Sequence, residues 1–114
     1  MKSDSILQSV KKIIGYPEEY TDFDKDLIMF INTEFGVLYQ HGVGTDNPFM
    51  ITGSSETWGD FIGDDDRLIF VETIVSLKAK ILFDPPQSSF VLENLKETVK
   101  ELEWRAYITE ETVE

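Results

Sequence analysis

Histidine and cysteine, which often supply general bases, nucleophiles and zinc ligands, are almost missing from this chain. It contains one histidine, His41, and no cysteine. His41 falls at the expected end of a helix, where the helix dipole favours a positive charge, so we interpret it as structural. Ser54 and Ser55 have no histidine at a spacing that indicates a catalytic triad. These residues predict neither nucleophilic catalysis nor a zinc site, and the lack of cysteine also removes disulfides.

Carboxylates are the remaining candidates, because they bind hard cations such as calcium and magnesium. Asp22, Asp24 and Asp26 alternate like the first three ligands of a calcium loop. Such a loop needs glycine at its sixth position and glutamate at its twelfth, but this chain has Leu27 and Thr33 there. The calcium pattern therefore fails.

A second group of acids leaves one alternative open. Asp64, Asp65, Asp66 and Glu72 would hold magnesium in a metal-dependent enzyme, although a solvated helix start explains the aspartates equally well. The glycines within residues 42–44 form no phosphate loop, since they follow a helix and lack the later glycine and lysine. We predict no enzyme, no catalytic residue, no metal site and no cofactor.

Length and charge restrict the remaining functions. The 114 residues are enough for one domain with its own core, so we treat residues 1–114 as a single domain. With 22 acidic and 10 basic residues the net charge is −12, which excludes coating of nucleic acid by phosphate neutralisation and disfavours anionic membranes. No apolar run is long enough to span a bilayer and no signal peptide is apparent, so we expect a soluble domain made in a cytoplasm.

Apolar residues at helical spacing predict two helices in the first part of the chain. The first begins after the capping residues Ser3, Asp4 and Ser5 and ends at Gly15. The second opens at Thr21 and Asp24, which have the spacing of a capping box, and ends at Gly42. The second helix is apolar over much of its circumference, so we expect it at the centre of the fold.

Two more helices are predicted in the second part. The third starts near Asp65 or Asp66 and stops at residues 84–86, where two prolines make a stiff corner. The fourth is capped by Ser88 or Ser89. Its apolar seam consists of Leu92, Leu95, Val99, Leu102 and Ala106. Residues 49–52 and 106–109 carry weak strand signals.

The connection over residues 42–66 is long for so small a domain, and such loops usually serve a function or an interface. A turn of helix is expected over residues 57–62. Phe49, Trp58 and Phe61 are large apolar groups there that either cap the domain's own core or contact a partner chain.

Trp104 lies off the seam of the fourth helix, so it either closes the core or contacts another chain. Residues 107–114 read as an acidic tail, with Tyr107 and Ile108 among its few apolar groups. The predicted fold class is all-α, a small bundle of about four helices with a long elaborated loop between the second and third. The candidate protein-interface residues are Phe49, Trp58, Phe61, Trp104, Tyr107 and Ile108.

Several segments, in order along nearly the whole chain, resemble one known family. They are residues 6–12 followed by Gly15, residues 22–24 with 27–28 and 31–32, residues 40–44 with Phe49, Ile51 and 57–58, residues 82–86 with 88–90, and residues 101–105. Together they resemble the head–tail connector (head completion, or adaptor) proteins of tailed bacteriophages and prophages of Gram-positive bacteria. The segment over 82–90 is the most distinctive.

The resemblance implies a virion protein of the neck, assembled in the cytoplasm of the host bacterium. Such proteins form a ring, commonly of twelve subunits, beneath the portal protein, and they present a surface to the next tail-proximal connector protein. DNA would pass through the ring without specific binding, and an acidic wall that repels phosphate suits that passage. No membrane is involved. We place subunit contacts in the long connection and portal docking in the tail after Tyr107.

The main alternative is a small acidic regulator or DNA mimic that blocks a nucleic-acid enzyme. Its net charge of −12 suits that role, but mimics spread carboxylates in long regular arrays. Here the acids cluster at helix starts, in one loop and in the tail. A regulator should act as a monomer or dimer, whereas a connector should form large rings.

Overall fold

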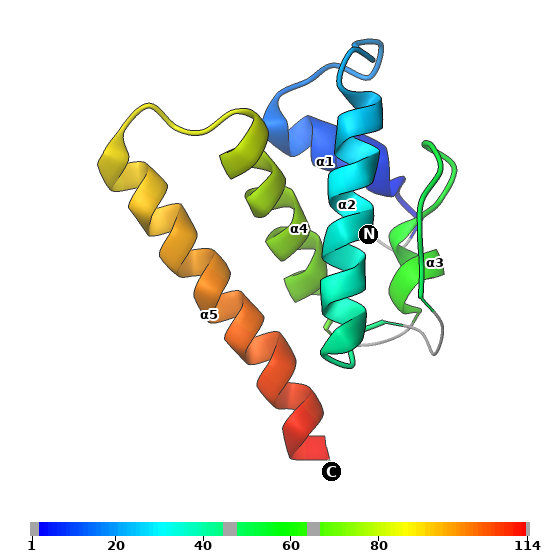
Figure 1. The fold of residues 1–114 in the computed structure, drawn as a ribbon, viewed down its shortest axis with the longest axis vertical. Coiled ribbons are helices and arrows are strands. Elements are labelled where there is room, and N and C mark those ends of the chain that lie inside the picture. The colour runs from blue at the N-terminus through cyan, green and yellow to red at the C-terminus, as the bar shows by residue number, and fades with distance from the viewer. Residues whose placement is uncertain (1–2, 45–47, 64–66, 114) are drawn as a thin grey trace.

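The computed structural model describes residues 3–44, 48–63 and 67–113, with side chains as far as Tyr107. Its helices are α1 (Ile6–Ile14), α2 (Asp24–Gln40), α3 (Trp58–Ile62), α4 (Leu68–Phe83) and α5 (Ser89–Val113) (Figure 1). The described residues contain no strand, only an isolated bridge between Ser5 and Thr57. The all-α prediction is confirmed, and α3 is the expected turn of helix within the long connection.

Helix ends follow local hydrogen bonding, as expected for most of them. The Ser5 hydroxyl accepts from the N–H of Gln8 at 3.2 Å and caps α1. Gly15, with a φ of 107°, ends that helix. Gly42, with a φ of 80°, follows α2 and donates its N–H to the carbonyl of Tyr39 at 3.0 Å.

The chain reversal at Gly42 also directs the following residue into the core. The Val43 N–H donates to the Leu38 carbonyl at 2.9 Å, which completes a Schellman motif. Both side chains are buried. The glycine cap predicted for the second helix is therefore confirmed.

The capping box predicted for Thr21 and Asp24 is wrong. The residue before α2 is Phe23, and no side chain caps that end. The carboxylate of Asp24 instead pairs with the Nζ of Lys11 at 3.0 Å, and that buried lysine also donates to the Glu18 carbonyl at 3.0 Å. A long-range ion pair thus outcompetes the local cap.

A capping box does form at α3. The Thr57 hydroxyl accepts from the Asp60 N–H at 3.2 Å, and the Asp60 carboxylate accepts from the Thr57 N–H at 2.9 Å. This short helix would be marginal alone, because it has only five residues. The box and the burial of its apolar side chains hold it in place.

The central helix is α4, not α2 as the sequence suggested. It packs against each of the other four helices, whereas α5 packs mainly on α4 (Figure 1). The reason is that α4 presents two apolar stripes, with Val71, Ile74, Val75 and Ala79 fully buried. By contrast, the buried apolar residues of α2 follow one stripe, formed by Leu27, Ile31, Phe35 and Leu38.

The long connection folds back on α2 and closes the core. Phe35 of α2 stacks on Phe61 with ring centroids 4.1 Å apart, and Phe49 and Trp58 pack against the same ring. The Asn32 side chain accepts from the Ile51 N–H at 2.7 Å and donates to the Ile51 carbonyl at 3.0 Å. These two hydrogen bonds anchor the loop to α2 in the way that a neighbouring β-strand would.

Replacing Gly44 by alanine should lower the free energy of unfolding by about 2–3 kcal/mol, because two costs add. The backbone φ is +125°, and a Cβ there would lie 3.0 Å from the ring of Phe61. That ring cannot withdraw, since it is stacked on Phe35. Gly36→Ala, in an open position on α2, should instead stabilise by about 0.5–1 kcal/mol. Urea titrations of both variants measure the contrast, and equal effects would contradict the assignment.

A carboxylate clip shapes the tip of the connection. Glu56 accepts from the Thr52 N–H and from the Thr52 hydroxyl, each at 2.8 Å, and from the Gly53 N–H at 3.4 Å. Burial raises the pKa of Glu56, but these hydrogen bonds outweigh it, so the pKa lies below its ordinary value.

Glu56→Gln should cost about 1 kcal/mol at neutral pH. Because the folded-state pKa is lowered, the wild-type advantage is complete above the ordinary glutamate pKa and disappears as pH falls through the folded value. Thermal melts of both proteins between pH 7 and strongly acid pH should therefore converge toward low pH. A gap that persists in acid would exclude the clip as its cause.

The α4–α5 corner and the start of α5 agree with the sequence. The Ser88 hydroxyl accepts from the Val91 N–H at 3.3 Å, which makes Ser88 the cap. Along the seam Val99 and Ala106 are buried, and the other seam residues are half-buried. Residues 106–109 belong to α5, so the strand signal there was wrong, and the segment set apart as a tail continues this helix to Val113.

Candidate partner-binding surfaces

A small ionic cluster fastens α5 to the rest of the molecule. The Nζ of Lys78 on α4 lies 2.8 Å from Glu34 Oε1 on α2 and 3.0 Å from Glu103 Oε2 on α5. Burial lowers the pKa of Lys78. Its hydrogen bonds to the two carboxylates raise the pKa by more than burial lowers it, so the pKa lies above its ordinary value. The lysine therefore stays charged and links three helices.

An aromatic stack adds to this attachment near the end of α5. The rings of Tyr107 and His41 lie nearly parallel, with centroids 3.9 Å apart. Burial, followed by the negative charge of Glu103, raises the pKa of the Tyr107 hydroxyl. This placement agrees with a structural role for His41.

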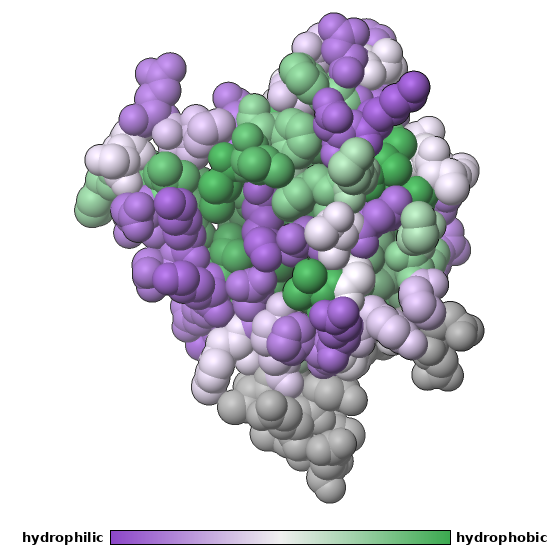
Figure 2. Space-filling model, viewed as in Figure 1, coloured by the Kyte–Doolittle hydropathy of each residue, from purple (hydrophilic) through white to green (hydrophobic). Residues whose placement is uncertain are grey.

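A shallow apolar groove lies between α4 and α5 beside the ionic cluster. Its volume is about 330 Å³, near the lower end for ligand pockets. Figure 2 shows the hydrophobic side chains gathered on this side of the molecule, with hydrophilic side chains along α5 next to them. The lining residues are Phe30, Lys78, Ile81, Leu82, Lys96, Val99, Lys100 and Glu103.

Part of the apolar wall of this groove is exposed to solvent. Leu82, one of its lining residues, is 62% exposed. Exposed apolar groups gathered in a groove mark interaction sites more often than isolated ones do. We call the groove lined by the residues named above the α4–α5 groove.

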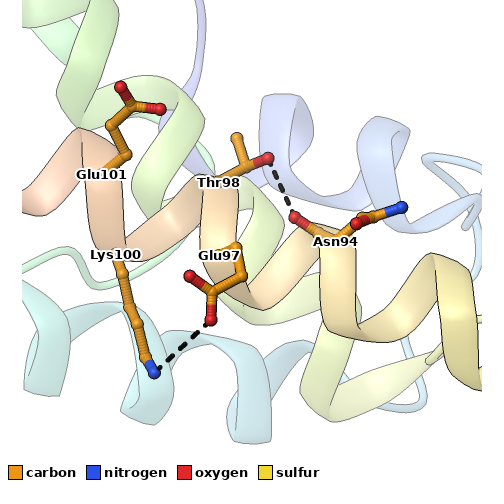
Figure 3. A pocket seen from close by; sticks show the side chains of 5 residues that line it. All are labelled: Asn94, Glu97, Thr98, Lys100 and Glu101. Atoms are coloured by element: carbon orange, nitrogen blue, oxygen red, sulfur yellow. Dashed lines mark hydrogen bonds and ion pairs between the residues drawn. The ribbon is translucent and has the colours of Figure 1, made fainter.

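The exposed side of α5 next to the groove forms a second candidate surface, and Lys100 lies on the border between the two. Trp104 is 60% exposed there, although tryptophan is usually buried. A hollow on this side is lined by Asn94, Glu97, Thr98, Lys100 and Glu101, all from one helix (Figure 3). Within it Thr98 donates to the Asn94 carbonyl at 2.9 Å, and Lys100 lies 3.8 Å from Glu97.

The hollow in Figure 3 is an open depression on the surface of α5. A single helix lines it, and among the described residues no second element brings a general base or an orienting group to it. Within the described part of the chain, no group of three or more His, Cys, Asp or Glu residues is arranged to hold a metal ion. Asp64, Asp65 and Asp66, proposed for magnesium, lie outside the described residues.

The predicted interface residues are distributed unevenly. Trp58 and Phe61 are each 1% exposed and Phe49 is half-buried, so these three fill the domain's own core. Trp104 is exposed, and Tyr107 is half-buried against His41. The side chain of Ile108 lies outside the described residues. An interface role stays a prediction, and among these residues Trp104 is the one whose side chain is open to a partner.

Two surface features were missed at the sequence level, namely the groove and the exposed ring of Phe90. The only available signal was that α4 carries more apolar positions than one neighbour covers. Leu82 lies near the end of α4 and is mostly exposed, because α5 diverges from α4 at that end (Figure 1).

Comparison with known proteins gives one match. A family model described as phage connector protein matches residues 6–113. Searches of curated proteins and of solved structures gave no match. None of the described helices combines the length and apolar character needed to cross a membrane.

Proposed function

The chain belongs to the phage connector protein family, and from this premise we propose that it forms a ring beneath the portal of a filled capsid. Membership itself gives the chain a structural role in joining the phage head to the tail, as a component of the virion. The proposal adds a ring of about twelve copies that extends the DNA channel and receives the next tail-proximal protein. Assembly would take place in the cytoplasm of the bacterial host.

The observation that carries the proposal is the extent of the family match. Residues 6–113 include all five helices, so the connector domain accounts for the whole fold rather than for one segment of it. This extent supports treating the chain as a single domain.

The charge of the chain supports passage of DNA without binding. The net charge is −12, and two of the lysines, Lys11 and Lys78, are used in ion pairs inside the fold. A surface of this sign repels phosphate and releases no counterions on contact with DNA. A lining made from it would let DNA slide through.

The proposed contact with the portal is the end of α5 after Tyr107, on account of its acidic sequence. We keep Tyr107 out of this contact, because it already stacks on His41. A chain shortened after Tyr107 should therefore fold normally and fail to attach to the portal.

In vitro complementation tests the function. Phage heads made without this protein should contain DNA yet carry no tail, and purified full-length chain should restore tail joining and infectivity. The chain shortened after Tyr107 should not. Heads that join tails equally well without the protein would contradict the connector role.

A further inference from the structure

Helix α5 lies outside the core that the other helices share. The core cluster is formed by buried residues of α1–α4 and of the long connection, and it contains no residue of α5. Among the described side chains of α5, only the half-buried Tyr107 packs against this cluster. Figure 1 shows α5 at the edge of the molecule, beside α4. The core of α1–α4 is therefore closed without α5.

The apolar contact between α5 and α4 is narrow. Of the described side chains of this 25-residue helix, only Val99 and Ala106 are buried. The other seam residues are half-buried, and the α4–α5 groove leaves part of the contact open. Hydrophobic stabilisation grows with the apolar area removed from water, so packing holds α5 less firmly than it holds the core helices.

Polar and aromatic contacts supply the rest of the attachment. Lys78 Nζ on α4 lies 3.0 Å from Glu103 Oε2 on α5, and the Tyr107 ring stacks on His41. If α5 moved away, Lys78 would keep its second partner, Glu34, at 2.8 Å. Glu103 would then be solvated by water. Release of α5 therefore leaves no buried charge without a partner, which keeps its cost low.

The connection between α4 and α5 can act as a hinge. Each helix ends with its own local bonds, because the Asp84 N–H donates to the Lys80 carbonyl at 2.8 Å and the Ser88 hydroxyl accepts from the Val91 N–H at 3.3 Å. Residues 85–87 make no hydrogen bond to any other described residue. Rotation about the ψ angles of residues 85–87 therefore breaks no hydrogen bond.

We propose that α5 is a hinged arm, which undocks from α4 as a unit about residues 85–87 while α1–α4 stay folded. The ion pair of Lys78 with Glu103 holds the arm closed. Opening exposes the apolar seam of α5 and the face of α4 beneath it, and closing covers both. Elements with few buried contacts open locally at a lower free energy than global unfolding.

Two single-cysteine variants test whether the arm opens separately, because the chain contains no cysteine of its own. Ala106→Cys lies on α5 and Ala79→Cys in the core cluster, and both alanines are 0% exposed. A thiol reagent should label the cysteine at position 106 at least about tenfold faster than the one at position 79. Labelling at 106 should depend weakly on urea, since local opening exposes little surface, whereas labelling at 79 should follow global unfolding.

A second pair of substitutions tests the ion pair that closes the arm. In the Ala106→Cys chain, Glu103→Gln should speed labelling about tenfold, because a charge-assisted hydrogen bond to Lys78 is lost. Glu101→Gln is the matched control on the same helix. It breaks only the exposed pair with Arg105 and should change the labelling rate by less than about twofold.

Hydrogen exchange of the wild-type chain checks the arm without any cysteine. Amides of α5 should exchange faster than those of α1 and α4, because a helix released into water is marginally stable. Equal labelling at positions 79 and 106 with the same urea dependence, or equal protection of α5 and the core helices, would overturn the arm. Equal effects of Glu103→Gln and Glu101→Gln would overturn the role of the ion pair. These measurements use the isolated chain, so their outcome is independent of the connector role.

Discussion

Trp58→Ala should lower the free energy of unfolding by about 3–5 kcal/mol, which is a large part of the stability of a domain this small. The side chain is 1% exposed and packs edge-on against Phe35, with ring centroids 6.4 Å apart. Its removal opens a cavity where α3 and the long connection meet α2. The surrounding rings are stacked on one another and cannot collapse into the space.

Two control variants isolate this packing effect. The indole N–H of Trp58 has no hydrogen-bond partner among the described residues, so Trp58→Phe keeps ring contacts and loses no bond. It should cost only about 1–2 kcal/mol. Trp104→Ala, at a side chain 60% exposed, should change stability by less than about 0.5 kcal/mol.

Chemical denaturation followed by circular dichroism measures all three variants. Because Trp104→Phe leaves Trp58 as the only tryptophan, the fluorescence of that variant should be blue-shifted in the folded state and shift red on unfolding. Comparable stability losses from Trp58→Ala and Trp104→Ala would contradict the placement of the two residues.

Lys78→Met should be the second large effect, at about 2–3 kcal/mol. The methionine can occupy the aliphatic space, but the carboxylate of Glu34 would keep its burial and lose its 2.8 Å partner. The loss of stability arises more from the unpaired, buried carboxylate of Glu34 than from the lost attraction between the two charges. We expect this loss to be smaller than for a fully buried ion pair, because the lysine side chain is 29% exposed.

The second substitution Glu34→Gln tests that explanation. If the stranded carboxylate causes the loss, Lys78→Met combined with Glu34→Gln should be more stable than Lys78→Met alone by about 1–2 kcal/mol. Lys80→Met, which removes only the exposed pair of Lys80 with Asp84, provides the matched control and should be nearly neutral. If the stability losses of the two single substitutions simply add in the double variant, the unpaired carboxylate of Glu34 is not the cause of the loss.

Local signals in the sequence predicted most helix ends. Ser5, Gly15, Gly42 and Ser88 act at short range, and each lies where its hydrogen-bonding or φ preference requires. The capping box predicted for Thr21 does not form, and the reason is a long-range contact. There the carboxylate of Asp24 meets Lys11 of another helix, a contact that no local pattern contains.

The position of helices in space was less accessible to sequence. Both α2 and α4 are apolar around much of their circumference, and spacing alone does not say which one has more neighbours. The answer depends on where α5 docks, and that is decided by Lys78 together with the stack of Tyr107 on His41. These contacts join residues far apart in the chain.

The candidate interface shows the same limit. Aromatic residues in a long loop fit a closed core or an open surface, and only the fold assigns Trp58 to the core. For the same reason the sequence does not decide between core and surface for Trp104, and the structure shows it exposed. The groove beside Leu82 was not foreseen, because it exists only through the angle between α4 and α5. The family, in contrast, was identified from ordered short segments and is confirmed.

The most direct test of the connector account is the mass of the complex with the portal. Purified chain would be mixed with the portal oligomer of the same phage, separated by size exclusion with light scattering, and imaged by electron microscopy. We predict a stable complex whose added mass corresponds to about one chain per portal subunit, visible as a ring below the portal. No added mass at high protein concentration and low salt would contradict the connector account and favour the alternative function of a small acidic regulator.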